Sequence, residues 1–153
     1  MTELCLQALP RQAYGLVGGA GASAPETVQP CRTNLRQDPR FGPLFEAHGD
    51  FYRDPDRGFV IDPREYLQIV GGMERRIGQR LVGVFHSHRC LDARPSALDR
   101  DFHFDPSLVC YIVSVRRPSE PDVRAYHIEG GRFHEIPIEI VRMARRTERS
   151  AVV

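Results

Sequence analysis

Apolar residues follow two different periods along this chain, and the shorter period predicts a sheet. Apolar or alternating runs, which are typical of strands, occur at residues 14–19, 27–30, 59–61, 81–88, 108–115, 123–128 and 132–140. Gly130 and Gly131 separate the last two runs and predict a hairpin turn. The glycine-rich stretch 19–24 lacks the Gly-Lys-Ser/Thr ending of a phosphate-binding loop, so we interpret it as a turn.

The longer period predicts one long helix between Asp62 and Gly78. Asp62 is suited to cap this helix and Pro63 to occupy its first position, and Glu65 lies three residues after the cap. Apolar residues at helical spacing are expected to form its buried stripe: Tyr66, Ile69, Val70, Met73 and Ile77.

Shorter helical segments are expected elsewhere. A second, shorter helix is predicted to begin at Ser96, and Pro10 suits the first turn of a helix that leads into the strand at 14–19. Residues 34–57 are polar and rich in proline and aspartate, so we expect an irregular segment with a short helix near 44–47. A loop of this length is often functional or mobile.

These elements predict an α/β protein with a central mixed sheet flanked by two main helices. The length of 153 residues suits a single domain, which we place at residues 1–141. Residues 142–153 are rich in arginine at first, and we expect them to form a flexible C-terminal tail.

Composition limits the classes of function. The formal net charge of +1 gives no strong basic field to attract nucleic acid. No run of about 20 apolar residues predicts a membrane span, and the first residues do not resemble a signal peptide. We therefore expect a cytoplasmic protein, in which the four cysteines, which form no Cys-x-x-Cys pair, are free thiols.

The main chemical signal is His86-Ser87-His88 followed, after seven residues, by Ser96-x-x-Asp99. Histidines two apart on a strand point to one face, and residues three apart share one face of a helical turn. A strand end and the next helix start can therefore bring two imidazoles and a carboxylate together, a set that binds catalytic Zn²⁺ with an open fourth position. Alone, His-x-His also serves packing, and Ser-x-x-Asp also forms a capping box.

The same pattern resembles the signature of the JAMM metallopeptidases, also called the MPN domain family. The similarity also covers the segments 10–19, 82–85 and 105–115 and spans about residues 4 to 140, with 34–57 the least similar part. It implies a cytidine-deaminase-like MPN fold with zinc bound by His86, His88 and Asp99. It also implies that Ser96 stabilises the oxyanion of the scissile carbonyl.

One position departs from the family pattern. Three residues before Gly15, where the resemblance implies the glutamate that moves the proton, the chain has Gln12. Glutamine has nearly the same shape and accepts hydrogen bonds, but it cannot hold the proton. Three explanations are open: a natural inactive or altered member, an engineered replacement of glutamate, or another base, for which Glu3, Glu46 and Glu65 are the nearest candidates. With a shifted alignment, Gln12 would instead be an ordinary surface residue.

Three residues near the motif are candidate substrate contacts. Arg89 and Arg94 could pair with a substrate carboxylate, although solvated loop arginines are the default. Cys90 stands where the family often has another residue, and it could be a fourth metal ligand, a reactive thiol or an incidental loop thiol. His103, between Asp101 and Asp105, could belong to a second metal patch or to a solvated turn.

The resemblance implies a zinc-dependent peptidase or isopeptidase. Its expected substrate is the C-terminal tail of a ubiquitin-like or sulfur-carrier protein with a Gly-Gly-type terminus, which could add as a strand at a sheet edge. The alternative is a non-catalytic MPN binding module that captures such a carrier, and a zinc hydrolase of small molecules is a third interpretation. A homodimer is also open.

Overall fold

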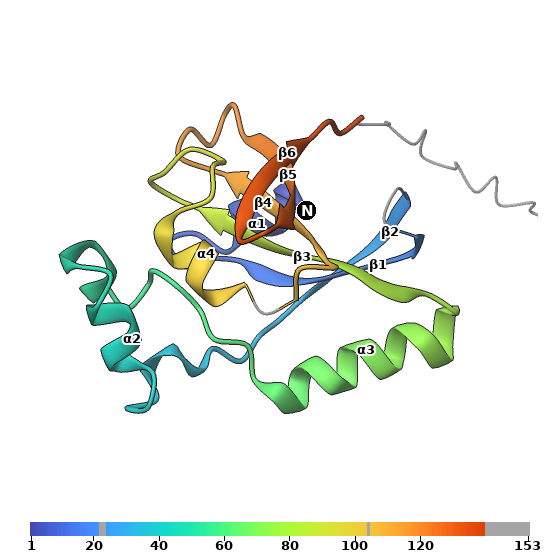
Figure 1. Ribbon diagram of the computed structural model, residues 1–153, viewed down its shortest axis with the longest axis horizontal. Coiled ribbons are helices and arrows are strands. Elements are labelled where there is room, and N and C mark those ends of the chain that lie inside the picture. Colours follow the sequence, from blue (N-terminus) through green and yellow to red (C-terminus); the bar gives the residue numbers. More distant parts are fainter. Residues whose placement is uncertain (22–23, 104, 140–153) are drawn as a thin grey trace, which may run out of the picture.

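A mixed six-stranded sheet forms the centre of the computed structural model, which describes residues 1–21, 24–103 and 105–139 (Figure 1). The strands are β1 (Tyr14–Gly21), β2 (Ala24–Pro30), β3 (Arg80–His88), β4 (Val109–Ser114), β5 (Asp122–Glu129) and β6 (Arg132–Ile136). Their spatial order is β2-β1-β3-β4-β5-β6. Strands β3 and β4 are parallel, whereas the other neighbouring pairs are antiparallel. The predicted α/β class with a central mixed sheet is confirmed.

The helices within these ranges are mostly short. They are α1 (Thr2–Gln7), α2 (Gly42–Glu46), α3 (Pro63–Ile77) and α4 (Ala97–Phe102), with two 3-10 turns at Leu35–Gln37 and Asp50–Arg53. Helix α3 has 15 residues, as its pattern predicts, and both of its ends have local causes. The side chain of Asp62 accepts a hydrogen bond from Arg64 N, and Gly78 ends the helix with a φ of 61°, which favours glycine.

The two faces of the sheet are covered by different helices. Helix α3 crosses one face (Figure 1), where Met73 packs with Leu16. On the other face, Cys5 of α1 packs with Phe85 and Val113. Every residue of β4 is buried, so side chains pack against both faces of the sheet at its middle. The end of β3, which pairs with β4, therefore lies on a rigid support.

Two of the predicted elements are wrong. The helix expected from Pro10 is absent, because the carbonyl of Ala13 accepts a hydrogen bond from Ser87 N and its N–H donates to Ser87 Oγ, which fixes this backbone beside β3. The strand expected at 59–61 is reduced to one bridge between Asn34 and Ile61. Val60 N donates to the side chain of Asn34 rather than to a neighbouring strand.

The remaining differences lie at the ends of elements. The strand expected at 132–140 ends at Ile136, before Pro137, which has no N–H to donate. Several predicted features lie outside the described residues: residues 22–23 of the turn, residue 140 of that strand, the end of the domain at 141 and the tail 142–153. Within the described ranges, no helix combines the length and apolar character needed to cross a membrane.

Candidate metal centre

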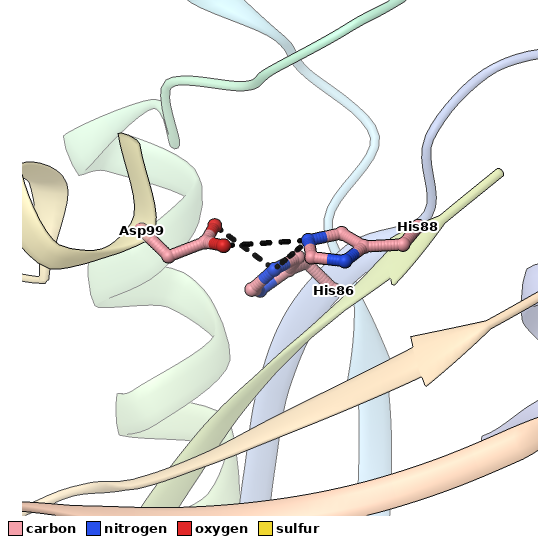
Figure 2. Close-up of side chains that lie close together, drawn as sticks. All are labelled: His86, His88 and Asp99. Atoms are coloured by element: carbon pink, nitrogen blue, oxygen red, sulfur yellow. Dashed lines mark hydrogen bonds and ion pairs between the residues drawn. The ribbon is translucent and has the colours of Figure 1, made fainter. Parts of the chain in front are cut away.

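His86 and His88 at the end of β3 face Asp99 in the first turn of α4 (Figure 2). Asp99 Oδ1 lies 3.0 Å from His86 Nε2, and Asp99 Oδ2 lies 3.3 Å from His88 Nε2. The two Nε2 atoms are 3.1 Å apart. All three side chains are at least nine-tenths buried. The alternation of β3 and the one-turn spacing of Ser96 and Asp99 thus bring together the side chains that the sequence pattern paired.

The spacing of these atoms fits a zinc ion. Zinc bonds to nitrogen and oxygen are about 2.0–2.2 Å long, so two ligand atoms of a tetrahedral site lie about 3.3 Å apart. The 3.1 Å between the two Nε2 atoms and the 3.0 Å between His86 Nε2 and Asp99 Oδ1 are close to that value, and one ligand atom from each of the three residues lies within 4.8 Å of the others. Within residues 1–21, 24–103 and 105–139, His86, His88 and Asp99 form the group of metal-binding side chains whose ligand atoms are close enough to share one ion.

Neighbouring backbone groups orient two of the candidate ligands. His88 Nδ1 lies 2.7 Å from the carbonyl of Asp92, so its N–H donates there and the ring is oriented with Nε2 toward Asp99. Ser96 N donates to Asp99 Oδ2 at 2.6 Å, and Asp99 N donates to Ser96 Oγ at 3.2 Å. The capping box that Ser-x-x-Asp also forms is therefore present here and fixes the carboxylate within the first turn of α4.

Electrostatics keep the carboxylate in its charged form. Burial alone would raise the pKa of Asp99, but the charges and hydrogen bonds of His86 and His88 outweigh it and hold that pKa well below its usual range. Burial lowers the pKa of His88, but the hydrogen bond and charge of Asp99 outweigh this and raise it. A buried anion beside two imidazoles is suited to bind a cation.

Gln12 lies beside this cluster. Its Oε1 accepts a hydrogen bond of 2.7 Å from Gly58 N, and the next residue, Ala13, is bonded to Ser87 between the two histidines. Gln12 lines both cavities that adjoin the cluster, one of about 30 Å³ and one of about 420 Å³. It is therefore not an ordinary surface residue. Glu65, in contrast, accepts hydrogen bonds from Arg32 N and Thr33 N, and neither Glu3 nor Glu46 lines these cavities.

Ser96 lines the smaller cavity together with Gln12 and His88. Its Oγ receives two hydrogen bonds, one from Asp99 N and one of 3.0 Å from the hydroxyl of Tyr52. Tyr52 belongs to the 3-10 turn at Asp50–Arg53, inside the segment 34–57 that the sequence predicts to be mostly irregular.

The candidate substrate contacts occupy different environments. Arg89 forms an ion pair with Asp54 and donates to the carbonyl of Pro10 at 3.1 Å. Cys90 is exposed, lines the smaller cavity and lies 3.9 Å from Arg57 Nη2, but it is outside the group of atoms that could share an ion. Arg94 is exposed. None of these positions shows a role by itself.

The model of the prokaryotic homologues of the JAB domain matches residues 3–129 of this chain. The chain belongs to this family. Two relatives named CysO-cysteine peptidase, from Mycobacterium tuberculosis and Mycobacterium bovis, are each 29% identical over 133 residues, which cover 86% of this chain and 78% of theirs. The solution structure of a protein from Desulfitobacterium hafniense is 33% identical with a TM-score of 0.72, covering 96% of this chain and 90% of that one.

A further solution structure, of a protein from Salinibacter ruber, is 24% identical with a TM-score of 0.55 and covers 93% of this chain and 84% of that one. This likeness bears on the fold alone. It agrees with the α/β architecture that the family membership and the sheet already show.

Sequence reasoning missed three parts of this JAB-domain site. They are the Gly58 N–H that holds Gln12, the Asp92 carbonyl that orients His88, and the Tyr52 hydroxyl bonded to Ser96. The first two are backbone groups, which every residue carries, so no residue type marks them. Tyr52 lies in a segment without periodic pattern, and no local signal connects it with Ser96.

Proposed function

We propose that this JAB-domain protein is a zinc-dependent peptidase or isopeptidase that acts on the C-terminal tail of a ubiquitin-like or sulfur-carrier protein. The observation that carries the proposal is the convergence of His86, His88 and Asp99 at zinc-ligand spacing, next to Ser96 and Gln12. The relatives named CysO-cysteine peptidase support both the peptidase class and a carrier-protein substrate.

His86, His88 and Asp99 would hold the ion, and the remaining residues would act on the substrate. When bound, zinc supplies Lewis acidity and lowers the pKa of water. The hydroxyl of Ser96 donates a hydrogen bond to the scissile carbonyl oxygen and to the oxyanion that it becomes. The walls of the two cavities around Gln12 confine the tail at this point.

Position 12 determines how fast such a site works. A carboxylate there would take the proton from the attacking water and give it to the leaving amine. In this chain the Gln12 amide is held at that place by Gly58 N but cannot hold the proton. We therefore expect slow hydrolysis by the chain as it stands, with binding of the substrate preserved.

The binding-module alternative has one specific observation in its favour. Gln12 keeps the shape of the site while removing its proton carrier, which fits capture of a carrier protein without cleavage. A scaffold of this kind has no need of a metal, whereas this chain keeps two histidines and a carboxylate that could hold a metal ion. A protein with a glutamate at position 12 should therefore hydrolyse the carrier if the site is a peptidase, and only bind it if the site is a binding module.

The decisive experiment restores that base. Gln12→Glu should raise zinc-dependent hydrolysis of a carrier fusion that has a Gly-Gly junction by about a hundredfold to ten-thousandfold, the usual contribution of general acid–base catalysis. The Gly58 N–H that holds the amide should hold the carboxylate in the same place. Turnover is measured by mass spectrometry of the released peptide, with zinc content measured on the same samples.

A matched control replaces an amide outside the site. Gln7→Glu alters α1, where Gln7 bonds only to Glu3 at the surface in the described structure, and should leave turnover unchanged. Equal and strong activity of the parent and Gln12→Glu would show that position 12 is not the base. Zinc-loaded Gln12→Glu that binds the fusion without cleaving it would favour the binding module.

A further inference from the structure

Tyr52 brings a hydroxyl from outside the family motif into contact with Ser96. Its phenol donates a hydrogen bond to Ser96 Oγ at 3.0 Å across 44 residues of sequence. Tyr52 and Ser96 both line the smaller cavity, together with Gln12 and His88. The contact therefore lies at the wall where a scissile carbonyl would be placed.

The hydrogen bonds of Ser96 determine where its own proton points. A serine hydroxyl has one O–H and two acceptor lone pairs. Asp99 N occupies one lone pair and the Tyr52 hydroxyl the other. With both lone pairs of Ser96 occupied, its O–H can only donate in the remaining direction. The cavity that Ser96 lines is the open space on that side. A serine held in this way is preorganised as a donor to an oxygen in that cavity.

Tyr52 is itself held in place by a buried arginine. The guanidinium of Arg36 donates to the carbonyls of Tyr52, Asp54 and Arg57 and lies over the ring of Phe45 at 4.2 Å. Burial raises the pKa of Tyr52, so the phenol keeps the proton that it donates. The hydrogen bonds from Arg36 thus fix the backbone around Tyr52, and its phenol has a defined position.

We propose that Tyr52 is a positioning residue that orients the Ser96 hydroxyl toward the scissile carbonyl, and this rests on the proposed peptidase function. Without the phenol, one lone pair of Ser96 is free and its O–H can rotate away from the cavity. If Tyr52 acts only through Ser96, its removal has no separate effect on turnover in a protein that lacks the Ser96 hydroxyl. This dependence on Ser96 is what the experiment tests.

The test is a double-mutant cycle in zinc-loaded Gln12→Glu protein with the carrier fusion as substrate. Tyr52→Phe should lower kcat about tenfold, the size of one neutral hydrogen bond, with KM changed less than twofold. Ser96→Ala should lower kcat about a hundredfold or more, and adding Tyr52→Phe to it should cause no further loss. Tyr111→Phe, which removes a phenolic hydroxyl from the core on the opposite face of the sheet, is the control and should keep the kcat of Gln12→Glu.

A second readout does not depend on turnover. The dissociation constant of the uncleaved fusion, measured on the Gln12 parent, should change less than twofold in Tyr52→Phe, because the cavity keeps its shape. An unchanged kcat in Tyr52→Phe, or a full additional loss on top of Ser96→Ala, would overturn the role of Tyr52 while the peptidase function stands. Absence of hydrolysis by Gln12→Glu would reject the peptidase function, and the role of Tyr52 with it.

Discussion

At the scale of single residues, the backbone of β1 passes so close to its neighbours that Gly15 has no room for a side chain. A Cβ at this position would collide with the carbonyl of Gln29 and lie 2.7 Å from the ring of Phe85. Gly15 pairs with Phe85 of β3, one residue before His86, so the same close approach sets the register that places the cluster of His86, His88 and Asp99. Glycine is required here by packing rather than by backbone torsion.

Replacing Gly15 with alanine should therefore reduce stability. We expect the free energy of unfolding to fall by about 2 kcal/mol, in the range that overpacking of a core produces. The measurement is urea denaturation followed by circular dichroism. Gly72→Ala is the matched control, because a Cβ there meets nothing within 4 Å. It should raise stability by about 0.5–1 kcal/mol through helix propensity. Equal effects of both substitutions would contradict this account.

At the scale of elements, the segment between β2 and α3 is organised by a few polar side chains rather than by regular structure. Arg36 binds three of its carbonyls, and Asn34 accepts hydrogen bonds from Arg36 N and Val60 N. Figure 1 shows this segment extending beside the sheet with α2 at its far end. Its ordered backbone is what allows Tyr52 and Gly58 to contact the site.

Removing the guanidinium should loosen this segment. Arg36→Met leaves three carbonyls without their charged donor, and we expect a loss of about 2–3 kcal/mol, as for hydrogen bonds to charged groups. Limited proteolysis should show new cleavage between residues 34 and 58, and chemical denaturation gives the energy. Arg53→Met removes an ion pair with Asp50 in which both side chains are more than 70% exposed, and it should change stability by less than about 0.5 kcal/mol. Resistance of Arg36→Met to the protease would contradict the anchoring role.

At the scale of the whole molecule, the candidate metal centre connects the central sheet with the short helix α4. His86 and His88 belong to the central sheet, whereas Asp99 belongs to a helix of six residues that follows a loop. A ligand that binds the native state and not the unfolded chain adds its binding free energy to stability. A bound ion would therefore stabilise the sheet, the loop and α4 together.

Zinc should raise the thermal midpoint of the protein. At a free concentration of about 100 times Kd, the added stability is about 2.7 kcal/mol, or roughly 5–10 °C for a chain of this size. Scanning calorimetry with zinc and with a chelator measures the shift, and His88→Ala should abolish it. His127→Ala is the control, because His127 is exposed and faces His134 across β5 and β6. A shift lost in His127→Ala but kept in His88→Ala would place the ion at the surface instead.

Sequence alone determined the features that depend on local spacing. The cap of Asp62, the period of α3 and the glycine at its end follow from neighbouring residues, and the structure has all three. The alternation of β3 puts His86 and His88 on one face, and the Ser96–Asp99 spacing makes one helical turn, so their convergence was predictable. These patterns repeat over three or four residues, where backbone geometry leaves few alternatives.

Only the tertiary structure decided the surroundings of the cluster. Gln12 reaches Gly58 across 46 residues, and Tyr52 reaches Ser96 across 44. Glu65, which local spacing placed in a capping box, instead binds the backbone of Arg32 and Thr33. Pro10 does not begin a helix, because the chain after it is already bonded to Ser87. Each outcome is a competition between a local preference and a distant partner, and only the folded chain brings that partner within reach.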